Sequence, residues 1–524
     1  MKHRTPTFSG VMLNAYPDSI GQKLSDCVEI LQWSEFKDVF SLFYILPTFF
    51  NSDLDRGFSI IDYDLNQDLV SVKDLEILEK LNIKLKFDIV LNHLSVASPQ
   101  FKDLLKHGEN SKYKDFFINW NQFWEKYGEK DEDGLVIPHK AYLDKLFMRK
   151  SGLPILNVTF PDGSEQPYWN TFYQKITVNS NGEKSYLGQM DVNAESELVW
   201  EFYKETLKKL KDYGCAILRL DAFAYLHKAV GETNFFNTPG TWDYLQRIKD
   251  IADKLNLTLL PEIHAEYGAK LHEEVANKGY QIYDFFLPGL LLHTIESKNS
   301  TALLKWVNDI LKHDYQVVNM LGCHDGIPVL DLKGKFTDRI YSEGLLSNAE
   351  IESIMQLVID RGGRVKNLYG ANGKKISYYQ INATYYSALD EVPEKLLLAR
   401  AIQLFMPGIP QVWYLDLFAG TNDYEAADSA GEGGHKEINR TNLSIETIKD
   451  RLQTKVVKQQ IELLRFRNTH QSFQGELTVQ QTERSKLIFK WKNENVWTQL
   501  EADLNEYSFW ITYGDGKSEK ILRF

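Results

Sequence analysis

The stretch LRLDAFAY, residues 218–225, places an arginine and an aspartate two positions apart at the end of an apolar run. The run itself, CAILRLDAF over 215–223, has the aliphatic content of a strand that is buried on both faces. Opposite charges at a strand end usually form an ordinary salt bridge, which contributes little to stability. Whether Arg219 and Asp221 do more depends on the strands around them.

Similar apolar runs recur along the chain, separated by amphipathic stretches. With 215–223 included, the predicted strands are 10–16, 38–47, 84–93, 215–223, 257–264, 280–288, 316–326 and 408–415. One predicted helix, 241–256, has an apolar face made of Trp242, Leu245, Ile248, Ile251 and Leu255. Another, 347–362, begins with a serine that can cap it. Eight buried strands that alternate with helices predict an α/β protein with a (β/α)8 TIM barrel.

Two connections are longer than a simple crossover requires, and long loops without periodicity are usually functional insertions. We therefore predict an inserted β-rich domain B after strand 3, a smaller insertion B′ before strand 8, and a C-terminal antiparallel β module. The predicted boundaries are 1–93 for the first barrel part, 94–187 for domain B, 188–362 for the second barrel part, 363–390 for B′, 391–468 for the barrel end and 469–524 for the C-terminal domain.

Composition excludes several classes of protein. The 72 acidic residues outnumber the 60 basic ones without forming a basic stripe, so we expect no nucleic-acid partner. The cysteines Cys27, Cys215 and Cys323 form no disulfide or zinc pattern. Near the N-terminus the apolar segment VML is too short for a signal peptide core, and no run anywhere approaches the length of a membrane span. We expect a cytoplasmic protein, monomeric or homodimeric, with no membrane partner.

Charged residues stand at the ends of several predicted strands: Asn92-His93 at the third, Arg219 and Asp221 at the fourth, Glu262 and His264 at the fifth, and His324-Asp325 at the seventh. Each has an ordinary explanation, such as an internally satisfied histidine, a helix N-terminal acid or a turn residue. In a parallel barrel, however, all strand ends open onto one face. Unpaired charges there are costly, so the set predicts an active site.

Two carboxylates and a third acid suit glycoside cleavage with retention of configuration. Asp221, two residues from Arg219, is favoured as the anion and suits the nucleophile. Glu262 follows the apolar LTLLP, which can raise its pKa, and suits the acid. Asp325 is left to stabilise the transition state. A metal is the rival use of such a cluster, but the chain has no H-E-x-x-H or H-x-H, so we predict no metal and no cofactor.

Four segments, DIVLNH, LRLDAFAY, LLPEIH and GCHDG, resemble in order the signature regions of the α-amylase superfamily of glycoside hydrolases. The resemblance implies a barrel with a domain inserted after strand 3. It also implies Asp221 as nucleophile, Glu262 as acid/base and Asp325 as transition-state stabiliser. His93, Arg219 and His324 fall where that superfamily surrounds the sugar at the cleavage point.

Further segments narrow the resemblance to the sucrose phosphorylase family: VMLNAYPDSIG, YILPTFF, DRGFSIIDYD, YDFFLPGLLLHT, HDGIPV, YQINATYYSAL, GIPQVWYL and KEINRTN. It implies that Asp55 and Arg440 bind glucosyl hydroxyls and that Phe58 and Tyr225 form an apolar wall, although ordinary core packing would also explain these two rings. It places Tyr379 and Gln380 on a mobile loop that faces the acceptor.

Members of this family resolve a glucosyl-aspartate with inorganic phosphate as co-substrate and release α-glucose 1-phosphate. GEGGHK, residues 431–436, lacks Walker spacing and is interpreted as a turn. The acceptor side departs from the sucrose phosphorylase pattern: FMRKSGLP puts Lys150 where an arginine is expected, and ISYYQ puts Ser377 where an aspartate faces fructose. Phosphate and acceptor candidates are therefore Arg149, Lys150 and Ser377, together with Tyr379.

The resemblance thus implies a retaining α-glucoside phosphorylase whose donor is sucrose, sucrose 6′-phosphate, glucosylglycerol or glucosylglycerate. A hydrolase or transglucosidase of the same superfamily is an alternative, which the phosphate dependence of product release would distinguish. A non-catalytic binding protein on the same fold is a third reading, and the intact Asp221, Glu262 and Asp325 argue against it.

Overall fold

The structure is a computed structural model that describes residues 8–150, 152–337, 340–369, 375–430 and 434–524, with the backbone alone at 366–369 and 375–379. All eight predicted barrel strands are present: β1 (Met12–Ala15), β2 (Leu42–Ile45), β5 (Lys84–Val90), β13 (Cys215–Asp221), β14 (Thr258–Pro261), β15 (Ile282–Asp284), β16 (Val317–Met320) and β22 (Ile409–Trp413). They belong to one sheet in the order β14-β13-β5-β2-β1-β22-β16-β15. This order confirms the (β/α)8 barrel.

The chain divides into two compact units, which we describe separately. The first consists of residues 1–44, 76–84 and 263–524, and the second of 45–75 and 85–262. These limits do not follow the domain boundaries given above, which stay predictions.

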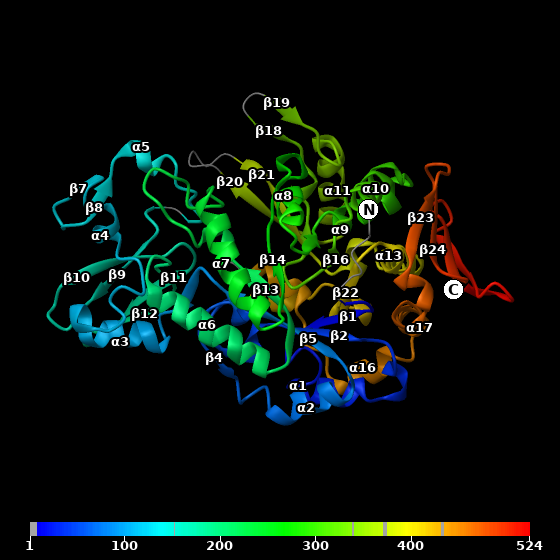
Figure 1. The fold of residues 1–524 in the computed structure, drawn as a ribbon, viewed down its shortest axis with the longest axis horizontal. Coiled ribbons are helices and arrows are strands. Elements are labelled where there is room, and N and C mark those ends of the chain that lie inside the picture. Colours follow the sequence, from blue (N-terminus) through cyan, green and yellow to red (C-terminus); the bar gives the residue numbers. More distant parts are fainter. Residues whose placement is uncertain (1–7, 151, 338–339, 370–374, 431–433) are drawn as a thin grey trace. The chain divides into compact units, whose positions relative to one another are not determined.

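The second unit contains the parallel strands β5, β13 and β14, with helices α6 (Glu197–Asp212) and α7 (Gly240–Lys254). Its long connection after β5 holds, in blue-green to cyan in Figure 1, the elements β6 (His93–Ser95), α3 (Pro99–His107), α4 (Trp120–Trp124), β7 (Gly128–Lys130), β8 (Val136–Pro138), α5 (Lys140–Leu143), β9 (Ile155–Thr159), β10 (Glu165–Trp169), β11 (Gln174–Val178) and β12 (Lys184–Asp191). Buried Trp120, Trp124 and Trp169 form a small core of their own. Antiparallel pairing of β6 with β12 sets His93 opposite Asp191.

The first unit contains β2, β1, β22, β16 and β15 with helices α1 (Leu24–Leu31), α8 (Leu271–Asn277), α9 (Leu287–Ser297), α10 (Thr301–His313), α11 (Asn348–Asp360), α13 (Pro393–Phe405) and α17 (Lys455–Thr469). Strands β17 (Ile327–Pro328), β21 (Lys375–Asn382) and β20 (Arg364–Tyr369) form a small antiparallel sheet. In the described part of the chain, no helix combines the length and apolar character needed to cross a bilayer.

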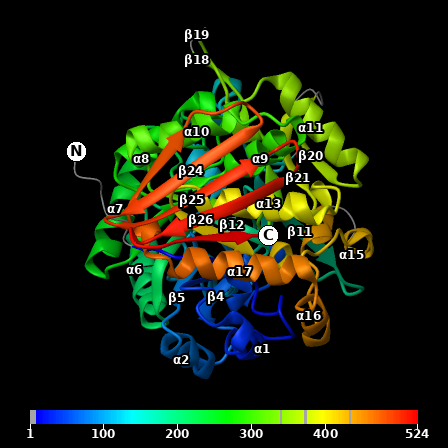
Figure 2. The same ribbon diagram turned by 90° about the vertical axis from the view of Figure 1, so that its right-hand side faces the viewer.

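The C-terminal module of the first unit is antiparallel, as predicted. Strands β23 (Glu476–Gln480), β24 (Lys486–Asn493), β25 (Val496–Asp503), β26 (Ser508–Gly514) and β27 (Glu519–Arg523) pair in chain order. Figure 2 shows this sheet lying over α13 and beside α17. The indole N–H of Trp491 on β24 donates to the carbonyl of Phe405, the last residue of α13, at 2.8 Å.

Local sequence signals account for the start of one predicted helix and for the buried face of the other. Ser347 caps α11 through a reciprocal capping box with Glu350. Helix α7 begins at Gly240 and buries Trp242, Leu245 and Ile248, as its apolar spacing predicts.

Candidate active site

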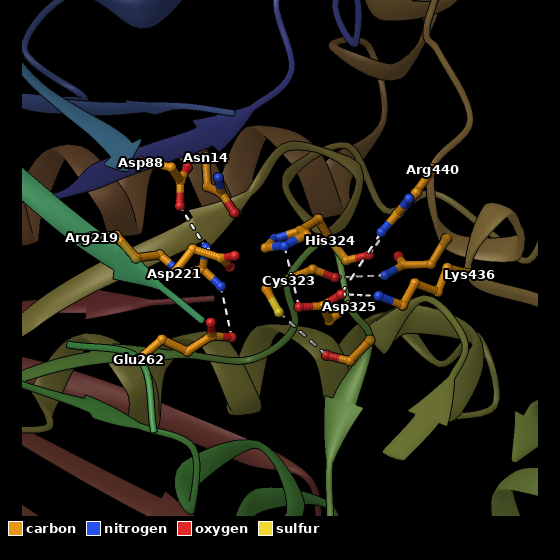
Figure 3. A network of polar contacts seen from close by, with 12 residues as sticks. Asn14, Asp88, Arg219, Asp221, Glu262, Cys323, His324, Asp325, Lys436 and Arg440 are labelled. Carbon is orange, nitrogen blue, oxygen red and sulfur yellow. Dashed lines mark hydrogen bonds and ion pairs between the residues drawn. The ribbon is translucent and has the colours of Figure 1, made fainter. Parts of the chain in front are cut away.

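The fourth predicted strand brings a cation among three carboxylates, as the left half of Figure 3 shows. On β13, Arg219 contacts Asp88 at 2.5 Å, Asp221 at 2.9 Å and Glu262 at 2.6 Å. The Arg219 side chain is 3% exposed, whereas Asp221 and Glu262 are 13% and 14% exposed. The two predicted catalytic carboxylates therefore share one buried guanidinium and keep one accessible face each.

Protonation in this cluster differs from the expectation that Arg219 keeps Asp221 ionised. Burial raises the pKa of Asp221 well above its ordinary value; the Arg219 charge opposes this rise, while Glu262 and Asp88 add to it. Asp221 and Glu262 also hydrogen-bond to each other. One guanidinium faces three buried carboxylates, so ionising Asp221 and Glu262 at the same time is disfavoured.

Asp88 is a member of this cluster that we did not predict. It lies directly opposite Arg219 in the parallel pairing of β5 with β13, and its side chain is 1% exposed. An acid inside the apolar run KFDIV was the available signal, because such a residue needs a buried partner.

Around this cluster, His93 and Phe58 contact each other. The His93 imidazole is buried, which lowers its pKa, and its Nε2–H donates to the Phe58 carbonyl at 3.1 Å. The Arg219 guanidinium lies 5.4 Å from the centre of the Phe58 ring. Asp55 is exposed, and its charge acts on His93. These glucose-side residues thus lie together in the second unit.

Tyr225 belongs to an aromatic cluster at the end of LRLDAFAY. Its ring centre lies 5.2 Å from that of Phe172 and 4.9 Å from that of Phe235. Phe172 also contacts the His93 ring at 5.0 Å. Phe172, a residue of the long insertion that sequence reasoning did not single out, therefore contacts both His93 and the predicted wall residue Tyr225.

The two cations of FMRKSGLP contact the segment that contains Asn170 and Phe172. The Arg149 guanidinium lies 5.5 Å from the Phe172 ring, and the Lys150 ammonium donates to the side-chain oxygen of Asn170. Burial lowers the pKa of Lys150 to about 8. Lys150 is thus a cation whose charge a bound anion would stabilise.

In the first unit, cations surround Asp325, as the right half of Figure 3 shows. Its carboxylate lies 3.2 Å from His324 Nε2, 2.5 Å from the Lys436 ammonium and 3.8 Å from Arg440. Burial opposes ionisation, but these three residues outweigh it and lower the pKa of Asp325 well below its ordinary value. Arg440 also donates to the His324 carbonyl at 2.8 Å.

Lys436 is a third residue that sequence reasoning missed, because GEGGHK was interpreted as a turn. It lies in a 3-10 helix, Gly434–Asn439, whose Asn439 donates to the carbonyl of Cys323 at 2.8 Å. Cys323, His324 and Asp325 offer atoms within 4.8 Å of one another that could bind a metal. The positive charges of Lys436 and Arg440 beside Asp325 disfavour a metal cation there.

The remaining predicted residues divide into described and undescribed ones. Gln380, on β21, is buried opposite Pro328. The side chains of Ser377 and Tyr379 lie outside the described residues. His264 stacks on Phe285 at 3.8 Å and pairs with the buried Asp331.

Comparison with known proteins shows which chains this one resembles. No protein-family model matches the chain. It is 59% identical over 514 residues to the sucrose 6(F)-phosphate phosphorylase of Ilumatobacter coccineus, covering 98% of this chain and 97% of the relative. It is 33% identical over 523 residues to the sucrose phosphorylase of Streptococcus mutans, covering 99% of this chain and 100% of the relative.

Among solved structures, the sucrose 6F-phosphate phosphorylase from Thermoanaerobacter thermosaccharolyticum matches with a TM-score of 0.86 at 33% identity, covering 98% of both chains. The chain therefore belongs to the sucrose phosphorylase family of retaining glucoside phosphorylases in the α-amylase superfamily.

Proposed function

We propose that this phosphorylase acts on sucrose 6′-phosphate, transferring its glucosyl unit to inorganic phosphate. The 59% identity over 98% of the chain to a sucrose 6(F)-phosphate phosphorylase carries this choice of donor. A second relative of that name is 34% identical, whereas the glucosylglycerol phosphorylase of Marinobacter adhaerens is 30% identical. The departures from the sucrose phosphorylase pattern at Lys150 and Ser377 support a donor other than plain sucrose.

In the first step, the Asp221 carboxylate attacks the anomeric carbon and Glu262 gives its proton to the departing fructosyl oxygen. A β-glucosyl ester forms on Asp221 and the glycosidic bond breaks. A nucleophile must be ionised and an acid protonated, and the interaction between Asp221 and Glu262, which disfavours two negative charges, suits that division. Arg219 contacts both groups and favours negative charge on whichever is ionised.

In the second step, inorganic phosphate attacks the same carbon on the face that the fructosyl group left. Glu262, now ionised, accepts the proton from the attacking phosphate, and the ester bond to Asp221 breaks. Two inversions give α-glucose 1-phosphate. We assign to Asp325 the stabilisation of the positive charge at the transition state, a role that its low pKa supports.

For the acceptor side, we propose that Arg149 and Lys150 bind phosphate oxygens, and that Lys150 binds those of the donor's 6′-phosphate group. A cation whose pKa is lowered by burial gains most from an anionic partner. Asp55, Phe58, His93 and Tyr225 are assigned to the glucosyl unit with Arg219, His324 and Arg440, and Ser377, Tyr379 and Gln380 to the acceptor, as the family resemblance implies.

The test is a donor panel under saturating phosphate. We expect kcat/KM for glucose 1-phosphate release to be highest for sucrose 6′-phosphate, by roughly tenfold or more over sucrose, glucosylglycerol and glucosylglycerate. Equal rates for sucrose and its 6′-phosphate would contradict the proposed donor while leaving phosphorolysis intact.

A further inference from the structure

A buried lysine that the mechanism does not use joins three segments of the second unit. The Lys228 ammonium donates to the side-chain oxygen of Asn92 at 2.9 Å and to the carbonyl of Tyr225 at 2.7 Å, and it pairs with the Asp191 carboxylate at 2.8 Å. An ammonium has three N–H donors, and these three oxygens account for all of them. The Lys228 and Asp191 side chains are 2% and 0% exposed.

Each partner of Lys228 is attached to the glucose side of the proposed site. Asn92 directly precedes His93, and Tyr225 is itself a proposed wall residue. Asp191 accepts both the backbone N–H and the hydroxyl of Thr171, at 2.8 and 2.6 Å. Thr171 directly precedes Phe172, the ring that contacts both His93 and Tyr225.

We propose that Lys228 is a positioning residue that fixes His93, Phe172 and Tyr225 relative to one another and so shapes the pocket for the glucosyl unit. In this proposal only the rings of His93, Phe172 and Tyr225 contact the sugar, and Lys228 acts through them. The inference rests on the proposed roles of His93 and Tyr225, and it extends them to the long insertion through Thr171 and Phe172.

Energetic reasoning favours positioning over stabilisation as the reason for this lysine. Two fully buried charges lose their hydration, and well-packed apolar side chains often stabilise a core equally well. An ammonium, however, holds three oxygens of separate segments at fixed distances, which an apolar side chain cannot do. The arrangement therefore suits a site that requires fixed geometry.

The experiment measures the binding of a glucose-shaped iminosugar, 1-deoxynojirimycin, by titration calorimetry, so that no turnover is needed. We expect Lys228→Met to raise the Kd tenfold or more, and the milder Thr171→Val to raise it about threefold. Lys208→Met is the matched control, because Lys208 is 71% exposed on α6, and its Kd should stay within twofold of the unchanged protein. Intact secondary structure by circular dichroism is required of each variant.

If Lys228 served only to stabilise the fold, Lys228→Met would give a smaller fraction of folded protein, and that fraction would bind the iminosugar with an unchanged Kd. An unchanged Kd in Lys228→Met therefore overturns the proposal, and if that variant does not fold, an unchanged Kd in Thr171→Val overturns it. Failure of the unchanged protein to bind the iminosugar also overturns it. Absence of phosphorolysis with iminosugar binding intact would instead count against the proposed function alone.

Discussion

At the scale of single residues, Arg219 decides how charge is distributed in the site. It lies within 2.9 Å of three carboxylates, so its single positive charge is divided among Asp88, Asp221 and Glu262 and does not fully neutralise any one of them. The sequence predicted the members Arg219, Asp221 and Glu262 from their places at strand ends. It could not predict Asp88 or Lys436, because their roles depend on strand register and on a loop contact, which residue spacing does not specify.

The acid role proposed for Glu262 leads to a prediction for Glu262→Gln. This variant has no proton to give, so glucosyl transfer from sucrose 6′-phosphate should fall by roughly 10²- to 10⁴-fold. Transfer from glucosyl fluoride, whose leaving group needs no proton, should fall far less, and the glucosyl ester on Asp221 should accumulate as an adduct visible by intact mass. Equal losses with both donors would refute the acid role of Glu262.

Lys150 gives a prediction that depends on pH. Its pKa of about 8 means that the ammonium is charged below pH 8 and loses its charge as the pH rises through that value. If it binds the donor phosphate, KM for sucrose 6′-phosphate should rise above pH 8, while KM for sucrose should not.

Lys150→Gln should remove that pH dependence and raise KM for sucrose 6′-phosphate roughly tenfold at neutral pH. The exposed Lys175→Gln, in the same insertion, serves as the control. Steady-state kinetics with both donors decide the matter: a parallel change for sucrose would show that Lys150 does not bind the donor phosphate.

At the scale of elements, all eight strands were predictable because buried parallel strands leave long apolar runs. Their ends were not: the run at 316–326 yields only β16, Val317–Met320. The residues that follow, including His324 and Asp325, leave the sheet, which is where a strand-end site requires them. A strand ends where its backbone hydrogen bonds to the neighbouring strands end. The apolar run in the sequence extends beyond that point, so it does not mark the last residue of the strand.

Asp284, at the end of β15, links two helices and gives a stability prediction. Its carboxylate accepts the N–H of Leu287 in α9 and the indole N–H of Trp306 in α10, both at 2.9 Å. Burial raises its pKa from 3.8 to about 6. Well below pH 4 this group is protonated in both folded and unfolded chains. Because the unfolded chain ionises first, the folded state loses about 3 kcal/mol of stability from this group as the pH rises from about 4 through 6.

Asp284→Asn keeps an acceptor but cannot ionise. We expect it to remove this part of the pH dependence, so that its melting temperature relative to the unchanged protein rises between about pH 4 and pH 7. Scanning calorimetry of the two proteins and of the exposed control Asp360→Asn measures the effect. A constant difference across that range would show that Asp284 does not titrate as burial predicts.

At the scale of the whole molecule, sequence similarity over 98% of the chain specifies a family, whereas the donor depends on a few residues in insertions. The barrel and its C-terminal sheet were predictable from periodicity. The side chains of Ser377 and Tyr379, which the resemblance places on the acceptor side, are outside the described residues. The proposal that sucrose 6′-phosphate is the donor is therefore supported by the comparison with relatives and by Lys150, and not by contacts of Ser377 or Tyr379.

The C-terminal sheet is expected to stabilise the first unit without taking part in catalysis. Trp491 is 7% exposed and anchors β24 to the end of α13. Trp491→Ala should lower the free energy of unfolding by about 3–5 kcal/mol with little change in KM. Trp510, 38% exposed in the same sheet, is the matched control, and an equal loss of stability in Trp510→Ala would contradict the anchoring role.

Phosphorus NMR of the unchanged protein acting on sucrose 6′-phosphate tests the central claim most directly. Retaining transfer through Asp221 predicts the α anomer of glucose 1-phosphate, formed one for one with fructose 6-phosphate and only when inorganic phosphate is present. Appearance of the β anomer, or release of free glucose at a rate indifferent to phosphate, would contradict it.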